Sequence, residues 1–372
     1  MPTTRPVVIY GASGFSGRLV AEYLCEYKIP FVAAGRDRAK ITEVMKNVPG
    51  IESADYEIAD VENSAKELAR LFSGAKVICN TVGPFIYSGP TVIEACLKSG
   101  CHYLDISGEQ AWIRQVAENW GPQFASKGLL AAPATAFMSA PSDAVVRICA
   151  ENTTLDTFEI LTMFRGAPTY GSTQTIFAVL QTEAYFLEQN EYKRWPPATA
   201  LEVVAPGQIQ TQLALAWGGF PHPVWFKDHR QVANVKSFGG LLDRQIMENV
   251  FATEKLYAEQ IAPLPKTERE RRLADMANSV QAGAPPRENA SENRTIDVIV
   301  GRGATEFTQC ALFGNCCYKQ TGLIQAYTAQ RLVHSSPCKL GFASVAEAFG
   351  PRELLKTLEE QGLSRMKMLA CA

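Results

Sequence analysis

The stretch Val7–Leu24, VVIYGASGFSGRLVAEYL, decides the fold of the first part of the chain. The apolar run Val7–Tyr10 is typical of a buried parallel strand. Glycines follow at positions 11, 14 and 17, and apolar residues from Leu19 to Leu24 then recur at the helical period. A second apolar run, Phe31–Ala34, completes a strand–turn–helix–strand unit of about 30 residues. The stretch therefore predicts the first βαβ unit of a doubly wound α/β domain.

The three glycines have separate uses in such a unit. Gly11 allows the sharp turn, Gly14 lets a ligand approach the backbone closely, and Gly17 lets the helix pack near the strand. The N–H groups and dipole at the start of the helix suit an anion, which here would be a pyrophosphate. The alternative is a structural glycine turn that binds no ligand.

The end of the second strand indicates which dinucleotide is bound. NAD-binding domains usually place an acidic residue there for the ribose hydroxyls. This chain instead has Arg36 directly after Gly35, and a guanidinium can hold a 2′-phosphate by a bidentate bond. Asp37 lies one position too late for the ribose role. The sequence therefore favours NADP(H) over NAD(H), unless Arg36 is only a solvated loop residue.

The alternation of strands and helices continues beyond this unit. Asp60 follows the apolar run at Tyr56–Ile58 and suits the adenine side of a dinucleotide pocket. The segment 80–84, NTVGP, lies at the carboxyl end of a buried strand, where open α/β sheets bind ligands. Its backbone would lie along the nicotinamide ribose. With further strands at 102–105 and 129–133, one doubly wound domain fills about the first 145 residues.

Several segments together resemble the saccharopine dehydrogenase-like oxidoreductases, in the branch that includes the trans-acting enoyl reductases of lipid and polyketide synthesis. The segments are GASGFSGRLVAEYL, AAGRDRAKI, NTVGPFIYSGPTVIEACLKSGCHYLDISGE and AFMSAPSDAVV. The likeness is densest over residues 6–145 and returns weakly at 165–175 and 341–363. It implies NAD(P)H-dependent reduction, a Rossmann domain, and a second α/β domain that closes over the cofactor.

The resemblance also implies site residues. The positions that match its nucleotide loop, its phosphate-selecting position and its nicotinamide loop are Gly11, Ser13, Gly14, Phe15, Gly17, Arg36, Asn80, Thr81, Val82, Gly83 and Pro84. Tyr103, Asp105 and Glu109 match its Y-x-D-x-x-G-E run. Two positions depart from the pattern: Met138 stands where many relatives have an acidic residue, and Ser172 interrupts a glycine pair before Thr173. Both departures bear on which substrate the protein binds.

The remainder of the chain predicts a second domain. Thr157–Phe164 is typical of a strand, and Gly171–Gln189 of a long apolar helix capped by Ser172 or Thr173. The aromatic segment Ala216–Phe226 either walls a hydrophobic pocket or packs in the core. Further elements are expected as follows: an exposed helix and mobile loop at 264–294, strands at 295–301 and 307–313, and a helix at 321–332.

We accordingly expect an NADP-binding Rossmann domain at residues 1–148 and a second, α/β (α+β) domain for substrate and dimerisation at 149–320. The segment 321–372 is expected to pack back on the first domain.

Composition excludes several other classes. The net charge of −2 gives no electrostatic basis for binding nucleic acid, and no run of 18 apolar residues indicates a membrane span. The ten cysteines include no C-x-x-C pair, which favours reduced, mostly buried thiols and no metal site. A cytoplasmic protein is expected, and the apolar strands of the second domain allow a homodimer.

Hydride transfer is the chemistry of the cofactor, so the protein supplies position and a proton. The candidate proton donors are Tyr87, His102, Tyr103, Tyr170 and His222. Tyr87 lies just past the Gly83-Pro84 turn, nearest the expected nicotinamide. We predict Tyr87, Tyr103 and Asp105 as the catalytic residues, although a carboxylate at the end of a strand is often a cap.

Two rival enzyme classes lack their motifs. No tyrosine has a lysine four residues later, as a short-chain dehydrogenase requires. Cys149 lacks the Gly/Asn-rich turn of a semialdehyde dehydrogenase nucleophile.

The sequence thus predicts an NADPH-dependent reductase of a conjugated C=C bond in an apolar small-molecule or carrier-bound intermediate of secondary metabolism. One alternative is an imine or opine-type reductase that grips carboxylates with Arg165, Lys193, Arg194 or Arg230. Another, of a different class, is an NADP(H)-binding sensor or scaffold without turnover, for which Met138 would mark a lost active site.

Overall fold

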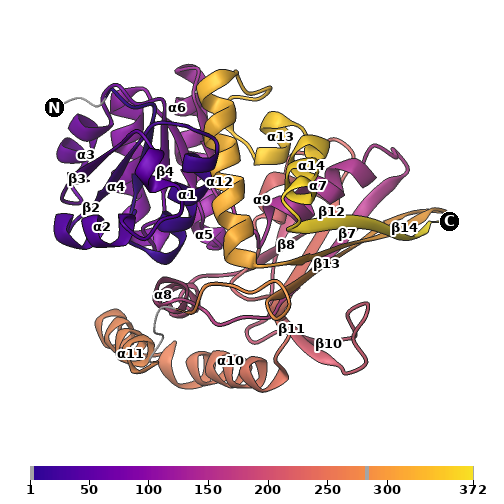
Figure 1. The fold of residues 1–372 in the computed structure, drawn as a ribbon. Helices are drawn as coiled ribbons and strands as arrows, with labels where there is room; N and C mark the ends of the chain where they lie inside the picture. The colour runs from indigo at the N-terminus through magenta and orange to yellow at the C-terminus, as the bar shows by residue number, and fades with distance from the viewer. Residues whose placement is uncertain (1–3, 281–284, 372) are drawn as a thin grey trace. The chain divides into compact units, whose positions relative to one another are not determined.

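The computed structural model describes residues 4–280 and 285–371 and divides the chain into two compact units (Figure 1). The first unit comprises the residues up to Ser107, then Trp112–Ala140 and Tyr318–Leu354. The second comprises Gly108–Ala111, Pro141–Cys317 and the residues from Leu355 onward. The chain therefore passes between the units several times.

The first unit is built on a seven-stranded parallel sheet with the order β15-β6-β5-β4-β1-β2-β3. Strand order reverses at β1, which lies between β2 and β4, and the carboxyl ends on either side of this reversal are where such sheets bind ligands. The predicted N-terminal Rossmann domain is confirmed. Its strands are β1 (Val7–Tyr10), β2 (Phe31–Gly35), β3 (Tyr56–Asp60), β4 (Val77–Asn80), β5 (His102–Asp105), β6 (Leu130–Ala132) and β15 (Gly341–Phe342).

Helices connect these strands, and one helix of this unit, α12, comes from a late part of the chain. Gly322 lets helix α12 approach helix α1 closely, because a Cβ atom at this position would lie 2.7 Å from the Cβ of Leu19. The helices of this unit are α1 (Phe15–Glu26), α2 (Arg38–Met45), η1 (Ile51–Ser53), α3 (Ala65–Phe72), α4 (Phe85–Ser99), α5 (Gln110–Gln115), η2 (Val116–Trp120), α6 (Gly121–Ser126), α12 (Cys317–His334) and α13 (Val345–Phe349).

The second unit is built on a nine-stranded mixed sheet, which confirms the predicted second α/β domain. Its main path is β10-β11-β12-β7-β13-β14-β16, with β8 and β9 attached through β12. Among the strand pairs that the structure describes in this second sheet, only β7–β12 is parallel. The strands are β7 (Leu155–Phe164), β8 (Tyr185–Glu188), β9 (Glu191–Arg194), β10 (Ala200–Val203), β11 (Gln212–Leu215), β12 (Asn234–Leu241), β13 (Arg294–Gly303), β14 (Phe307–Asn315) and β16 (Ser364–Cys371).

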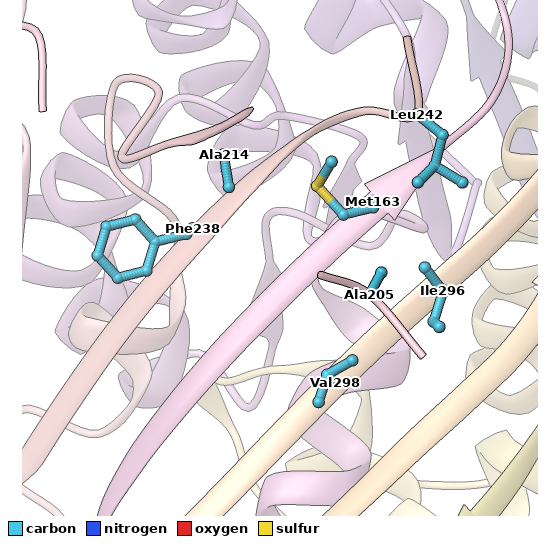
Figure 2. Packing of buried hydrophobic residues seen from close by; sticks show 7 residues of the cluster. All are labelled: Met163, Ala205, Ala214, Phe238, Leu242, Ile296 and Val298. Atoms are coloured by element: carbon cyan, nitrogen blue, oxygen red, sulfur yellow. The ribbon is translucent and has the colours of Figure 1, made fainter. Parts of the chain in front are cut away.

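One face of this sheet carries an apolar core (Figure 2). Met163 of β7, Phe238 of β12, and Ile296 and Val298 of β13 lie on neighbouring strands of this face. Side chains alternate between the faces of a strand, so Thr162 and Asp297 point to the opposite face. The helices of the second unit are α7 (Ala140–Cys149), α8 (Tyr170–Val179), α9 (His222–Trp225), α10 (Arg244–Leu256), η3 (Tyr257–Ile261), α11 (Lys266–Ser279) and α14 (Pro351–Glu360).

The predicted long helix at 171–189 is wrong. Helix α8 ends at Val179, and Tyr185–Glu188 forms strand β8, in which Leu187 pairs with Val235 of β12. The predicted cap is also wrong, because Thr169 accepts the capping hydrogen bond from the N–H of Ser172. The apolar pattern of this segment suits a helix and a strand equally, and pairing with β12 decides between them.

Two other expectations for the second domain have mixed outcomes. The aromatic segment 216–226 is core: Phe220, Trp225 and Phe226 are buried. The exposed helix expected near 264 is α11, while part of the expected mobile loop, residues 281–284, lies outside the described residues.

Candidate active site

The glycine turn at the end of β1 is held tightly by the backbone. The N–H groups of Gly11 and Ala12 both donate to the Ala34 carbonyl, at 2.9 and 3.0 Å, and Gly14 N–H donates to the Gly11 carbonyl at 2.9 Å. Gly11 has φ +97°, and a Cβ atom on Gly17 would lie 2.4 Å from the Gly11 oxygen. Both positions therefore require glycine.

The start of α1 is open to a ligand. Gly14 is the N-cap residue, it is exposed, and it supplies no side-chain cap to the helix. Ser13 and Phe15 flank it and are partly exposed. The positive end of the helix dipole is thus accessible to an anion.

The loop 80–84 lies against this turn. The hydroxyl of Thr81 donates to the carbonyls of Tyr10 and Gly11, at 3.0 and 3.1 Å. A Cβ atom on Gly11 would lie 2.5 Å from that hydroxyl oxygen. The Gly83-Pro84 peptide is cis. The structure therefore brings the two predicted cofactor segments together at the strand-order reversal between β1 and β4.

A buried hydrogen-bond network supports the loop from below. The side-chain oxygen of Asn80 accepts from Val82 N–H at 3.0 Å, and its Nδ2 donates to the Tyr103 hydroxyl at 3.2 Å. Tyr103 in turn donates to Asp105 at 2.8 Å. Asn80, Tyr103 and Asp105 are all fully buried. Burial and the neighbouring Asp105 raise the pKa of Tyr103 well above its usual range, so this phenol stays protonated.

Asp105 joins strand β5, helix α5 and the loops that follow β5 and β6. Besides Tyr103, it accepts hydrogen bonds from Trp112 Nε1 at 2.8 Å and from the N–H groups of Ser107 and Ala134, both at 2.9 Å. Ala134 has φ +57°, which this bond helps to hold. The geometry makes Asp105 an anchor for the segments that follow β5 and β6. Nothing in the sequence pattern pointed to Trp112, whose indole completes this set of donors.

The cations after β2 differ in their surroundings. Arg38 donates to the Ile58 carbonyl at 2.8 Å and pairs with Asp60 at 3.2 Å, with both side chains about 60% exposed. Asp37 caps α2 by accepting from Lys40 N–H at 2.9 Å, so its carboxylate is engaged away from a ribose. Arg36 is exposed and forms no hydrogen bond or ion pair within the described chain. Arg36 is therefore available to a 2′-phosphate.

The candidate proton donors fall into two groups. Tyr87, in the first turn of α4, is 58% exposed, and Tyr170 at the start of α8 is 57% exposed. His102 accepts from Leu130 N–H through Nδ1 at 2.9 Å, and burial lowers its pKa to about 4. His222 is buried between Ser142 and Ser237, at 3.0 and 3.1 Å. Tyr87, His102 and Tyr103 belong to the first unit, and Tyr170 and His222 belong to the second.

An ion pair within helix α7 follows Met138 in the sequence. Asp143 is fully buried and accepts two hydrogen bonds from Arg147 Nε, each 3.0 Å long. Met138 itself is partly exposed. Asp143 is the acidic residue of this motif that the chain retains. Its carboxylate is therefore engaged in an ion pair within α7.

The cysteines give neither a metal site nor a disulfide. All ten are thiols outside any disulfide, seven of them are buried, and the sulfur atoms of Cys149 and Cys310 lie 3.7 Å apart. Within the described residues no group of three or more histidine, cysteine or acidic side chains could hold a metal ion. Nor does any helix there combine the length and apolar character needed to cross a membrane.

The fold and the glycine turn together define a dinucleotide-binding α/β domain joined to a mixed-sheet domain. Residues 142–371, more than half of the chain, match a family of unknown function (DUF5938), and the chain belongs to that family. Residues 7–131 match the Saccharopine dehydrogenase NADP binding domain. This second match confirms the predicted resemblance and the NADP(H) cofactor.

Curated relatives match less than half of this chain. A lipid droplet localized protein of Caenorhabditis elegans is 35% identical over 157 residues, covering 39% of this chain and 36% of the relative. A human saccharopine dehydrogenase-like oxidoreductase is 31% identical over 152 residues, covering 37% and 35%. A trans-acting enoyl reductase of Mycobacterium leprae is 32% identical over 140 residues, covering 37% and 33%. The matches thus span about a third of the length of these relatives.

A solved structure extends the likeness in fold to the whole chain. The apo saccharopine dehydrogenase (L-Glu forming) of Saccharomyces cerevisiae aligns with a TM-score of 0.62, covering 98% of this chain and 100% of that chain. Its sequence identity is 12%, so the comparison concerns the fold alone.

Proposed function

We propose that this chain is an NADP(H)-dependent oxidoreductase that reduces a conjugated C=C bond of an apolar, small-molecule or carrier-bound substrate. The observation that supports this most is the meeting of the Gly11–Gly17 turn with the loop 80–84 at the strand-order reversal. Such a position suits a nucleotide whose pyrophosphate lies at the start of α1 and whose nicotinamide lies at the loop.

Each cofactor residue has a proposed task. Gly14 and the backbone of Ser13 and Phe15 receive the pyrophosphate, while Gly11 and Gly17 shape the turn. Arg36 holds the 2′-phosphate, and Asp60 lies on the adenine side. The backbone of the loop formed by Asn80, Thr81, Val82, Gly83 and Pro84 orients the nicotinamide, whose bound form supplies the hydride.

We assign Tyr87 as the proton donor because it is exposed and begins the helix that follows the loop. Tyr103 and Asp105 have no exposed surface, so we propose that they serve as positioning residues that hold the loop through Asn80. A proton donor typically contributes about 10²–10⁴-fold to a reaction rate.

The choice of a C=C bond rests on likeness to the enoyl reductase, since Phe220, Trp225 and Phe226 of the aromatic segment 216–226 are buried. Imine or opine-type reduction is the alternative. Of its proposed carboxylate-binding residues, Lys193 pairs with Glu191 and Arg194 with Glu183, which leaves Arg165 and Arg230 without an ion pair in the described chain.

The remaining proposals concern the whole protein. We propose a nucleotide domain at 1–148, joined by part of 321–372, and a substrate domain at 149–320. We also propose a homodimer formed through the second domain, since β16 lies at the end of the sheet path and Met368 on it is 62% exposed. Size-exclusion chromatography with light scattering tests the dimer. A cytoplasmic location and a role in secondary metabolism complete the proposal.

The test of the reaction is substrate-dependent loss of NADPH absorbance with a panel of enones, enoyl thioesters and cyclic imines. We expect turnover with a conjugated C=C compound, and a Tyr87→Phe variant with kcat lowered at least about 100-fold and unchanged NADPH affinity. Turnover of imines alone would favour the opine-type alternative. Tight NADPH binding with no turnover of any compound would favour a sensor.

A further inference from the structure

The second unit contains a hollow that is lined mostly by polar residues. It has a volume of about 390 Å³, and its lining residues are Arg165, Gln208, Leu242, Ser291, Glu292, Asn293 and Arg294. All of these residues belong to the second unit and none belongs to the segments assigned to the cofactor. We propose that this hollow, named here the arginine hollow, binds a phosphate monoester group.

Two guanidinium groups are brought together by the sheet itself. Thr295 of β13 pairs with Phe164 of β7, so the next residues outward, Arg294 and Arg165, face one another, and Arg165 N–H donates to the Arg294 carbonyl at 2.7 Å. Like charges on opposed residues repel one another and destabilise a sheet. Neither arginine forms an ion pair within the described residues. An anion held between them would relieve the repulsion.

The segment 289–293, which supplies part of the lining, is held by its own hydrogen bonds. Asn293 Oδ1 accepts from Asn289 N–H at 2.8 Å, and Asn289 Oδ1 accepts from Ser291 N–H at 3.0 Å. Asn293 Nδ2 donates to the Arg165 carbonyl at 3.3 Å, which joins this segment to the end of β7. A site that is already ordered loses less entropy when it binds a ligand.

The net positive charge of the lining favours an anionic group. Two guanidinium groups and one carboxylate, Glu292, line the arginine hollow. Arginine presents paired N–H donors that match the oxygens of a phosphate, and a phosphate monoester carries nearly two charges near neutral pH. A single carboxylate ligand would leave one of the arginines unmatched.

The rim indicates an amphiphilic ligand. Gln208 lies in the turn between β10 and β11, and the same turn carries Ile209, 98% exposed, and Val204, 58% exposed. Apolar side chains this exposed beside a cationic hollow suit a ligand with an apolar arm next to its phosphate. Phosphopantetheine and phosphatidic acid share this chemistry.

Calorimetric titration at saturating NADPH, with the nucleotide site filled, tests the proposal. The probes are 4′-phosphopantetheine, dioctanoyl phosphatidic acid and inorganic phosphate. We expect binding of at least one organic probe, weakened at least about tenfold by Arg165→Ala and by Arg294→Ala. Glu292→Gln is expected to tighten binding, because it removes a negative charge from the hollow.

Arg302→Ala is the matched control, since Arg302 lies on the same strand and pairs with Glu159 at 2.9 Å. It should leave the affinity unchanged. Preference for phosphopantetheine or for phosphatidic acid tells a free pantetheine phosphate from a lipid headgroup. Equal affinities of wild type, Arg165→Ala and Arg302→Ala, or no binding of any probe at millimolar concentration, would overturn the proposal. Since binding is measured independently of turnover, failure here leaves the proposed reductase reaction standing.

Discussion

At the scale of single residues, a buried hydrogen-bond network links the loop 80–84 to the Y-x-D-x-x-G-E run. The sequence analysis identified these two motifs separately. Tyr103 receives a hydrogen bond from Asn80 and gives one to Asp105. We therefore expect Tyr103→Phe to lower the free energy of unfolding by about 1–3 kcal/mol, because Asn80 loses its acceptor and Asp105 one donor inside the core. Urea unfolding followed by fluorescence measures this change.

Tyr56→Phe is the control for Tyr103→Phe. Tyr56 stacks on Phe31 and its hydroxyl makes no hydrogen bond in the described chain, so its loss should cost little. If the two variants were equally stable, the network would contribute nothing measurable.

Asp297 gives the second unit a dependence on pH. Burial raises its pKa from 3.8 to about 7, although the Thr162 hydroxyl donates to it at 2.6 Å. A carboxyl whose pKa is raised by folding favours the native state when protonated. Stability should therefore fall as pH rises from about 4 to about 7, by about 4 kcal/mol at most.

The test is denaturation of Asp297→Asn at pH 5 and pH 8. The asparagine keeps an acceptor for Thr162 and cannot ionise, so the variant should gain on wild type as pH rises. Asp228→Asn serves as control because its side chain is 96% exposed. An equal difference from wild type at both pH values would show that Asp297 does not titrate in this range.

The chemistry of individual residues was only partly predictable from the sequence. The roles of Gly11 and Gly17 follow from their spacing, and the structure agrees because neither tolerates a Cβ atom. The burial of Tyr103 and Asp105 could not be predicted, since it depends on Trp112 and Ala134, which reach Asp105 only through the tertiary fold.

At the scale of elements, the packing of α1 on β1 depends on one glycine. A Cβ atom on Gly17 would lie 2.4 Å from the Gly11 oxygen and 2.8 Å from the Ala12 Cα, so the helix must shift. We expect Gly17→Ala to destabilise the protein by about 1–3 kcal/mol and to weaken NADPH binding, because the turn and the start of α1 move together. Thermal unfolding and NADPH fluorescence titration measure the two effects.

The matched control is Gly108→Ala, where a Cβ atom would meet nothing within 4 Å. It should bind NADPH as wild type does. Unchanged NADPH affinity in Gly17→Ala would contradict the proposed position of the pyrophosphate.

The prediction of helices and strands succeeded where the apolar periodicity and the glycine turns agreed. In the first domain, apolar runs alternate with helical periods and glycine turns, and the parallel strands lie where these runs predict. The prediction of one helix at 171–189 is wrong because the apolar residues of this segment fit both the helical period and the strand period. Its break after Val179 is set by the turn at Thr182, whose hydroxyl donates to the Val179 carbonyl, and by the pairing of Leu187 with Val235. Neither contact is visible in the local pattern.

At the scale of the whole molecule, the chain completes each unit with segments that are distant in sequence. Residues 318–354 return to the first unit and add β15 beside β6, whereas β16 pairs with β14 in the second. The sequence indicated two domains from the change in pattern near residue 157. It could not show how the last fifty or so residues are shared between them, because such packing depends on long-range contacts.

The central claim is that the Gly11–Gly17 turn and Arg36 bind NADP(H). The most direct measurement is a fluorescence titration of wild type and Arg36→Ala with NADPH and with NADH. We predict tight binding of NADPH and weak binding of NADH by wild type, and a loss of about tenfold or more in NADPH affinity, with NADH affinity unchanged, in the variant. Failure of wild type to bind either nucleotide, or equal affinity of Arg36→Ala and wild type for NADPH, would contradict the account.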